Sequence, residues 1–284
     1  MGFQASCADP CLFMATRNDK KIYLIVYVDD FLIGCESEDE ITRVQKQLSQ
    51  HFEIVNLGDV KHFLGQEVPR ENGVFSVSLT NYIEQLVVRT SLSEAKTART
   101  PMDQSYLKDE VDSKPFEDGT KYRSVLGALL YVAVCARPDI ATSVGILGRK
   151  FSAPTEADWT AAKRVVRYLK ETMDWKLQLG GKKAEDLVAF SDSGWAGDKS
   201  TRKSTTGYVV FYGGGAVCWV SRRQSCVTLS TMEAEYVALA ETCQEVVWLR
   251  RLLEDFGEKQ VKATVINEDN QPNKQLRALI KHLS

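Results

Sequence analysis

The chain has 284 residues, enough for two compact domains, because one hydrophobic core seldom grows beyond about 250–300 residues. Its hydrophobic content of 44% and charged content of 26% are ordinary for a globular protein and exclude a fibrous or largely disordered chain. The formal net charge of -2 excludes a globally basic nucleic-acid-binding protein, so affinity for nucleic acid would require local clusters of Lys and Arg.

Other classes of protein are disfavoured by what the sequence lacks. The seven cysteines are odd in number and scattered, which indicates neither a disulfide framework nor a zinc site. No apolar run reaches the roughly 18 residues of a membrane span, and the amino terminus lacks a signal-peptide pattern. We therefore expect a protein that is neither secreted nor in a membrane.

The first predicted element is a buried hairpin. Residues 22–28 and 31–34 are apolar runs rich in β-branched side chains, and Asp29 and Asp30 lie between them. A turn is an ordinary place for Asp, so the pair alone carries little weight. Because two like charges beside an apolar sheet are unfavourable without a cation, the flanking runs favour a metal site.

A helix, a second hairpin and another helix are expected next. Ser37 and Glu40 have the spacing of a capping box, which predicts a helix start. Asn72-Gly73 lies between two apolar runs and predicts a hairpin turn. The predicted elements are a helix at 37–48, strands at 63–68 and 74–79, and a helix at 81–88.

A polar segment with two prolines, residues 91–120, predicts a linker and a domain boundary. Three helical stretches follow, at 122–134, from Pro138 onward, and at 156–171. One face of the last carries Lys163, Arg164 and Arg167. These could contact phosphates, although a solvated helix face is the commoner explanation.

The last part of the chain predicts a β-meander and a long helix. Strands are expected at 187–190, 207–212, 216–221 and 226–229, and a final strand at 263–266. Ser230 and Glu233 form a second capping box, which opens a helix that ends near Gly257.

Three acids of this last part occupy related positions. Asp192 ends the first strand, Glu233 opens the long helix, and Asp269 follows the last strand. Each has an ordinary explanation in turn or cap formation. Together they match the arrangement of carboxylates that a two-metal phosphoryl-transfer site requires.

Motifs along nearly the whole chain resemble the Pol polyprotein of copia-type retrotransposons. They are Tyr27-Val28-Asp29-Asp30, Phe63-Leu64-Gly65, Arg137-Pro138-Asp139-Ile140, Ser191-Asp192-Ser193, Trp195-Ala196-Gly197-Asp198, Arg202-Lys203-Ser204-Thr205, Glu233-Ala234-Glu235-Tyr236 and Glu268-Asp269-Asn270-Gln271. The first resembles the family's polymerase motif, and the last five resemble its ribonuclease H segment.

This resemblance implies a fold of class α+β or α/β. It comprises the remainder of a reverse-transcriptase palm with a following β/α unit over residues 1–90, and a linker with a helical thumb and connection over 91–180. A ribonuclease H-like mixed β-sheet with helices is implied over 181–284, truncated at its carboxyl end. The implied partners are an RNA/DNA hybrid and other parts of the Pol polyprotein, with no membrane. The implied location is a cytoplasmic retroelement particle or the nucleus.

The resemblance also assigns roles to particular acids. Asp192, Glu233 and Asp269 are implied as ligands of two Mg²⁺ ions, for which Mn²⁺ is expected to substitute. Glu233 is preferred to Glu235, which is expected to point elsewhere because it lies two positions further along the helix. Asp29 and Asp30 are implied as metal-binding carboxylates of the polymerase.

The chain departs from the family pattern at both ends. The segment that carries a third polymerase carboxylate does not precede Asp29, and residues 272–284 match the family poorly, with no fourth ribonuclease H acid. Hydrolysis of RNA in hybrids is therefore expected ahead of DNA synthesis. The alternative is an inactive remnant that at most binds nucleic acid.

Basic and aromatic residues near the second group of acids have two interpretations. Phosphate contacts are implied for Arg202, Lys203, Arg222 and Arg223, and simple surface charge is about equally expected. Three tryptophans could stack on nucleotides, but aromatic residues of helices and strands are more often part of the core. They are Trp195, Trp219 and Trp248.

Overall fold

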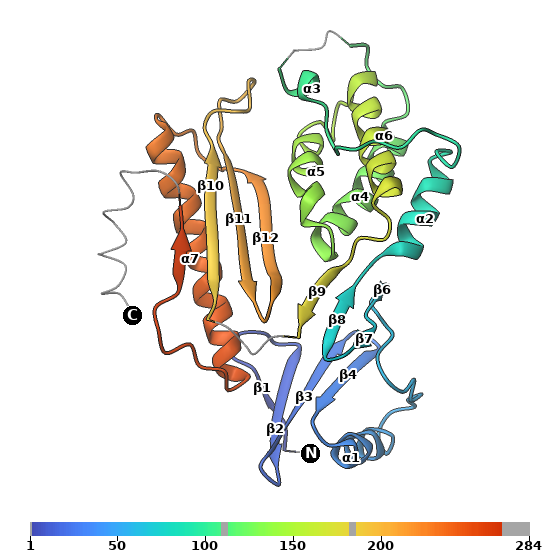
Figure 1. Cartoon of the computed structure of the whole chain (residues 1–284), viewed down its shortest axis with the longest axis vertical. Coiled ribbons are helices and arrows are strands. Elements are labelled where there is room, and N and C mark those ends of the chain that lie inside the picture. Colours follow the sequence, from blue (N-terminus) through green and yellow to red (C-terminus); the bar gives the residue numbers. More distant parts are fainter. Residues whose placement is uncertain (1, 109–112, 182–185, 269–284) are drawn as a thin grey trace. The chain divides into compact units, whose positions relative to one another are not determined.

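The computed structural model describes residues 2–108, 113–181 and 186–268. Of the described residues, those at 2–60 and 243–264 form one compact unit and those at 61–242 and 265–268 form the other. Figure 1 labels their helices and strands. Among the described residues the helices and strands form a mixed α+β protein, as expected. No described helix has the length and apolar character that crossing a membrane requires.

The first unit is built on an antiparallel sheet with strand order β1-β2-β3-β4. Its elements are β1 (Gln4–Ala5), β2 (Leu12–Arg17), β3 (Lys20–Tyr27), β4 (Asp30–Cys35) and α1 (Glu38–Leu48). Ile22 and Leu24 of β3 pack with Val44 and Leu48 of α1 in a buried cluster. The hairpin and the helix predicted here are both confirmed.

The capping box predicted at Ser37 is wrong, although Ser37 does precede α1. Its side chain makes no capping hydrogen bond. The Glu40 carboxylate instead accepts a hydrogen bond from Asn18 at 3.0 Å and lies 3.8 Å from Arg43. Glu40 therefore ties the helix to the turn between β2 and β3.

The end of helix α7 (Thr231–Asp255) and the residues after it complete the first unit. The Trp248 indole donates to the Ala8 carbonyl at 2.9 Å, and the Tyr23 hydroxyl donates to the Phe256 carbonyl at 2.8 Å. Gly257 adopts a φ of 77°, a conformation favoured by glycine, so the helix ends where the sequence predicts.

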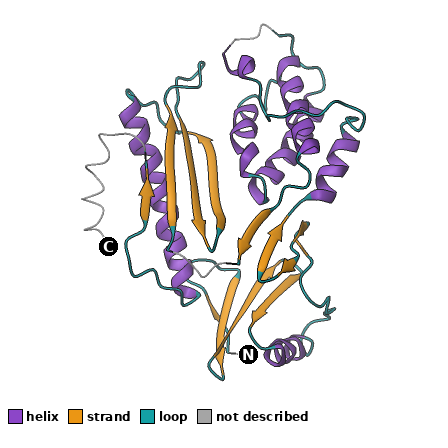
Figure 2. Ribbon diagram, in the orientation of Figure 1, coloured by secondary structure: helices purple, strands orange, loops and turns teal. Residues whose placement is uncertain are grey.

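Helices form the larger core of the second unit (Figure 2). They are α2 (Thr80–Arg89), α3 (Gln104–Lys108), α4 (Gly119–Cys135), α5 (Ala141–Gly148), which follows a short 3₁₀ turn at Pro138–Ile140, and α6 (Glu156–Glu171). Tyr122, Leu129, Leu147 and Leu169 are fully buried in this core. The helices expected around residues 81–88, 122–134 and 156–171 are confirmed.

The second unit also holds a mixed sheet with strand order β12-β11-β10-β13. Its strands are β10 (Val188–Gly194), β11 (Thr205–Tyr212), β12 (Gly215–Arg223) and β13 (Val265–Asn267). The first three form the predicted meander, and β13 runs parallel to β10. The strand predicted at 226–229 is wrong, because that segment is irregular and joins no sheet.

Small strands join segments that the sequence assigned to separate domains. The strand predicted at 63–68 is interrupted by a turn in which Leu64 and Gly65 have φ of 50° and 79°, giving β5 (His62–Phe63) and β6 (Gln66–Glu67). After the predicted Asn72-Gly73 turn, β8 (Val74–Val77) pairs with β7 (Arg70–Glu71) and with β9 (Leu177–Gly180), which the sequence did not predict. The domain boundaries near residues 90 and 180 remain predictions.

Candidate functional site

The turn between β3 and β4 presents the first two predicted acids. Tyr27 pairs with Asp30, so Val28 and Asp29 form a two-residue turn, and all four residues are exposed. Val28 has a φ of 52°, which is uncommon for a β-branched residue. Such backbone strain often accompanies functional sites, so the turn stays a candidate site with both carboxylates open to solvent.

Asp192 lies within β10, opposite Gly207 of β11, rather than just after the strand. Its side chain is exposed, whereas that of Ser191 is buried and accepts a hydrogen bond from Thr242 of α7 at 3.0 Å. Because successive side chains of a strand point to opposite faces, Asp192 projects from the face that α7 does not cover.

Glu235, in the first part of α7, is a buried acid whose pKa is influenced by the charge of Asp192. Its side chain is 6% exposed, and its Oε2 atom has no hydrogen-bond partner among the described residues. Burial raises the pKa of this carboxyl, the charges of Asp192 and Glu268 raise it further, and Ser193 partly offsets the rise. The preference for Glu233 over Glu235 as the active acid stays a prediction.

Glu233 instead helps to begin the helix. Its backbone N–H donates to the Ser230 hydroxyl at 3.1 Å, and its Oε2 accepts from the Leu229 N–H at 2.6 Å. This is close to the predicted capping box, with the carboxylate bound one residue earlier. Residues two apart on a helix point about 200° apart, so Glu233 and Glu235 cannot face the same way.

The third predicted acid, Asp269, lies outside the described residues. Glu268, which precedes it, follows β13, and β13 pairs with β10 up to Phe190 and Asn267. Within residues 2–108, 113–181 and 186–268, no three His, Cys, Asp or Glu side chains are grouped closely enough to hold a metal ion. The described part of the site therefore consists of neighbouring carboxylates and does not form a complete metal centre.

Three of the four basic residues proposed as phosphate contacts are engaged within the protein. Lys203 donates to the Ser225 carbonyl at 2.6 Å, and Arg222 lies 3.2 Å from Glu241 of α7. Arg223 lies 2.7 Å from Asp198. Arg202 is exposed, and its side chain makes no hydrogen bond or ion pair with another described residue.

The basic face of α6 holds a loop. Arg164 donates to the Thr100 carbonyl at 3.2 Å and lies 3.2 Å from Asp103, and Arg167 donates to the Lys96 carbonyl. The Lys163 ammonium lies 5.6 Å from the centre of the Trp159 ring. These contacts favour a structural role for the face over phosphate binding.

The three tryptophans proposed as possible stacking platforms each donate an indole hydrogen bond to a backbone carbonyl. Besides the Trp248–Ala8 bond, Trp195 donates to Thr228 at 3.2 Å and Trp219 donates to Ala133 of α4 at 2.8 Å. Each indole therefore has a structural contact, although Trp195 and Trp248 are exposed.

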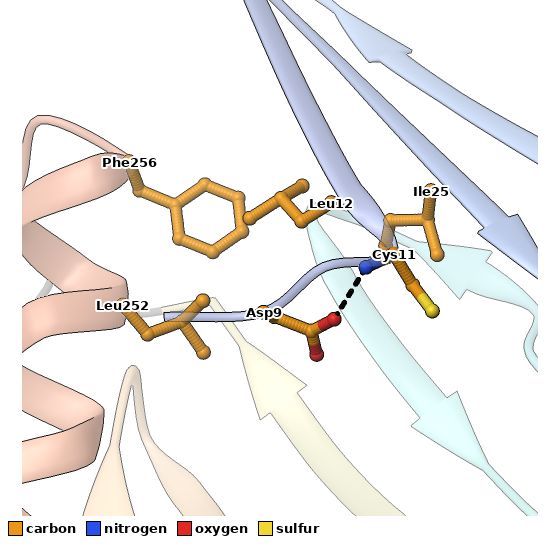
Figure 3. Close-up of a pocket in the computed structure, with 6 residues that line it drawn as sticks. All are labelled: Asp9, Cys11, Leu12, Ile25, Leu252 and Phe256. Carbon is orange, nitrogen blue, oxygen red and sulfur yellow. Dashed lines mark hydrogen bonds between the residues drawn. The ribbon is translucent and has the colours of Figure 1, made fainter. Parts of the chain in front are cut away.

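A small pocket in the first unit has a volume of about 110 Å³ (Figure 3). Apolar side chains form most of its wall, and its one carboxylate, Asp9, accepts a hydrogen bond from the Cys11 N–H at 2.8 Å. The lining residues are Asp9, Cys11, Leu12, Ile25, Leu252 and Phe256. The polar groups do not converge on the cavity, which makes it a packing feature in our interpretation.

Comparison with known proteins assigns the chain to a family. Residues 1–104 match the family model described as reverse transcriptase (RNA-dependent DNA polymerase). An uncharacterized mitochondrial protein of Arabidopsis thaliana is 37% identical over 80% of this chain and 94% of its own length. The retrovirus-related Pol polyprotein from transposon TNT 1-94 of Nicotiana tabacum is 36% identical over 97% of this chain. The chain belongs to the Pol polyprotein family of copia-type retrotransposons.

This member of the Pol family contains a reverse transcriptase-like domain at its amino end. The chain spans 22% of the length of the tobacco polyprotein and 18% of that from transposon RE1 of Arabidopsis thaliana, to which it is 36% identical. No solved structure matches the chain. The reverse transcriptase match ends at residue 104, well before Asp192 and Glu235.

Proposed function

We propose that the carboxyl-terminal part of this Pol chain hydrolyses the RNA strand of RNA/DNA hybrids. The observation that carries the proposal is the burial of Glu235 within electrostatic range of Asp192 and Glu268. Like charges are costly in such a position, and a bound cation relieves that cost. The resemblance of the surrounding motifs to a ribonuclease H segment supplies the reaction.

The donor set fits Mg²⁺, a hard cation that prefers carboxylate oxygens. Asp192 offers an exposed carboxylate, and Oε2 of Glu235 is buried with no hydrogen-bond partner among the described residues. A bound metal ion would satisfy this oxygen. Asp269 is the expected third ligand. A pair of bound Mg²⁺ ions supplies water activation and stabilisation of the leaving oxygen, and Mn²⁺ is expected to substitute.

The chain's own residues would hold the substrate by its backbone. A hybrid is recognised by its shape, its phosphates and its 2′-hydroxyls rather than by base sequence. Of the four basic residues considered above, Arg202 is the one whose side chain has no partner among the described residues, so it is proposed to make such a contact. Other parts of the Pol polyprotein are proposed partners, in a cytoplasmic particle or in the nucleus.

Asp29 and Asp30 are proposed to contribute to a second metal site, that of a polymerase. The strained, exposed turn supports this role, because it presents both carboxylates to solvent.

Cleavage of an end-labelled RNA/DNA hybrid by the purified chain, in Mg²⁺ and in Mn²⁺, tests the nuclease. Asp192→Asn should abolish cleavage while leaving the circular dichroism spectrum unchanged. The same RNA in single-stranded form controls for contaminating ribonucleases. A folded chain that leaves the hybrid intact in both metals would support the alternative, an inactive remnant that at most binds nucleic acid.

A further inference from the structure

Asp198 is a buried carboxylate that the proposed reaction does not use. Its side chain is 6% exposed and accepts hydrogen bonds from the Ser200 hydroxyl at 2.7 Å and the Thr201 N–H at 3.0 Å. Arg223 donates to it at 2.7 Å, and Arg149 lies 4.0 Å away. Asp198 is thus the centre of a network. Its carboxylate is bound by residues of its own loop and by two arginine side chains, and bonds to charged donors are the stronger kind.

The two arginines belong to different elements of the second unit. Arg223 ends β12, and Arg149 follows α5 and also donates to Thr205 of β11 at 2.7 Å. The helix approaches the strand so closely that a Cβ on Gly145 would lie 2.7 Å from the Ser221 carbonyl oxygen. Asp198 is therefore bound by arginines from two elements, β12 and the end of α5, which pack closely against each other.

The loop at residues 195–203 takes its shape from Asp198. The Asp198 carbonyl accepts from the Arg202 N–H at 2.7 Å, and the Asp198 N–H donates to the Lys203 carbonyl at 3.2 Å. Arg202 has a φ of 57°, a strained conformation that persists only where the surroundings impose it. The network consequently fixes the direction in which the exposed Arg202 side chain leaves the loop.

Strand register places Arg223 of this network on the same face of the sheet as Asp192. Asp192 pairs with Gly207, and two residues further along the sheet Gly194 pairs with Thr205, which pairs with Arg223. Paired residues and residues two apart share a face, so Asp192 and Arg223 project from the same side of the sheet. Strand spacings of about 4.8 Å and a rise of about 3.3 Å per residue separate their Cα atoms by roughly 12 Å.

We propose that Asp198 is a positioning residue for nucleic-acid binding, which orients the loop at 195–203 so that Arg202 contacts a backbone phosphate of the hybrid. This inference rests on the proposed function for its substrate. It assigns to Asp198 a role that is separate from metal binding, because Arg149 and Arg223 already neutralise its charge.

The sign of the expected effect separates positioning from simple electrostatics. Removal of a negative charge beside a phosphate path would by itself strengthen binding of a nucleic acid. Loss of positioning would weaken binding, because Arg202 would no longer be held at its phosphate. Asp198→Asn is therefore expected to lower affinity for the hybrid although it makes the protein more positive.

The affinity of the full chain for a labelled RNA/DNA hybrid is measured by fluorescence anisotropy in Ca²⁺, across a series of salt concentrations. Arg202→Gln should weaken binding about threefold and reduce the slope of log K against log salt by about 0.9, the contribution of one phosphate. Asp198→Asn should do the same. The double variant should be no weaker than either single variant, because both remove one contact.

The control is Arg89→Gln, which removes an exposed arginine from α2 and should leave affinity and salt slope unchanged. Additive losses in the double variant, tighter binding by Asp198→Asn, or failure of the parent chain to bind the hybrid would each overturn the proposal. Asp198→Glu replaces Asp198→Asn if the latter does not fold. Binding is measured without cleavage, so absence of nuclease activity alone would leave this result standing.

Discussion

Asp198 and Glu235 are two carboxylates of the second unit that are each 6% exposed, yet their surroundings shift them in opposite directions. For both, burial raises the pKa. At Asp198 the bonds from Arg223, Ser200 and Thr201 outweigh burial and hold the pKa well below its usual range. At Glu235 burial is reinforced by the charges of Asp192 and Glu268, and the pKa is raised.

The contrast shows that the neighbouring charges, rather than burial, decide what a carboxylate is suited to do. Asp198 is already neutralised by protein cations, so it is suited to hold structure. Among the described residues, Glu235 has no ion pair with a basic side chain, and one of its oxygens has no hydrogen-bond partner. Such a group is destabilising until a proton or a metal ion binds, which is what a functional site requires.

The largest expected effect is on cleavage of the hybrid. Glu235→Gln should lower the rate about a hundredfold, because it removes a charged metal ligand while keeping the size of the side chain. Glu233→Gln serves as the comparison, since this neighbour belongs to the helix cap. It should cost about 1 kcal/mol of stability and little activity. Single-turnover cleavage and urea unfolding measure the two effects.

The opposite ranking, with Glu233→Gln inactive and Glu235→Gln active, would support the assignment of Glu233 made from the motif. That assignment illustrates what the sequence could and could not decide. Ser-x-x-Glu correctly predicted the start of α7 at Ser230. The same match made Glu233 conspicuous, although a capping glutamate has its carboxylate occupied by backbone N–H groups and is a poor candidate ligand.

The capping pattern also failed at Ser37, for a reason that lies outside the local sequence. Glu40 has the required spacing, but Asn18 and the cations Arg17 and Arg43 lie near it in the folded unit. These tertiary partners replace the backbone N–H as the carboxylate's contact. The helix begins where predicted because its apolar period and acidic first turn suffice without the box.

Strands were predictable where apolar residues were continuous and failed where pairing depended on distant segments. The hairpin of β3 and β4 and the meander of β10 to β12 follow from local patterns. Strand β9 has too few residues to show a period, and the strand with which it pairs, β8, lies about a hundred residues earlier. The segment at 226–229 has the composition of a strand, but no strand pairs with it.

The second prediction tests whether the position of α5 supports Asp198. A Cβ at Gly145 would meet the Ser221 carbonyl oxygen at 2.7 Å, so Gly145→Ala must push α5 away from β12 and with it Arg149. The free energy of unfolding should fall by about 2 kcal/mol. Loss of the Arg149 contact should also bring the affinity for the hybrid down toward that of Asp198→Asn.

Gly127 of α4 provides the matched control, because a Cβ there meets no atom within 4 Å. Gly127→Ala should raise the free energy of unfolding by about 0.5–1 kcal/mol, the ordinary gain from replacing glycine in a helix. Urea unfolding of both variants separates the gain in stability from higher helix propensity, expected in both, from the loss caused by the clash with β12, expected only in Gly145→Ala. Equal stabilisation by the two alanines would show that α5 does not approach β12 this closely.

The smallest expected effect is on how stability depends on pH in the absence of divalent cations. The pKa of Glu235 is higher in the folded state than in the unfolded chain. At pH values between these two pKa values, the folded state therefore binds more protons than the unfolded chain. Stability should therefore fall as the pH rises through this window. Glu235→Gln removes the penalty, so the variant should be the more stable protein at pH 7 and equal to the parent in acid.

For Asp198 the free energy of unfolding should depend on pH in the opposite direction, because its pKa is lowered in the folded state. The stability that this carboxylate contributes is fully present above the pKa of an ordinary aspartate. It is lost as the pH falls toward the lower pKa of the folded state. Asp198→Asn should be less stable than the parent at pH 7, and the difference should shrink in acid. Urea unfolding in EDTA from about pH 3 to pH 7 measures both variants.

Addition of Mg²⁺ should then stabilise the parent more than Glu235→Gln, because only the parent has the carboxylate pair that gains from the cation. Equal stabilisation of the two proteins would contradict the assignment of Glu235 as a ligand.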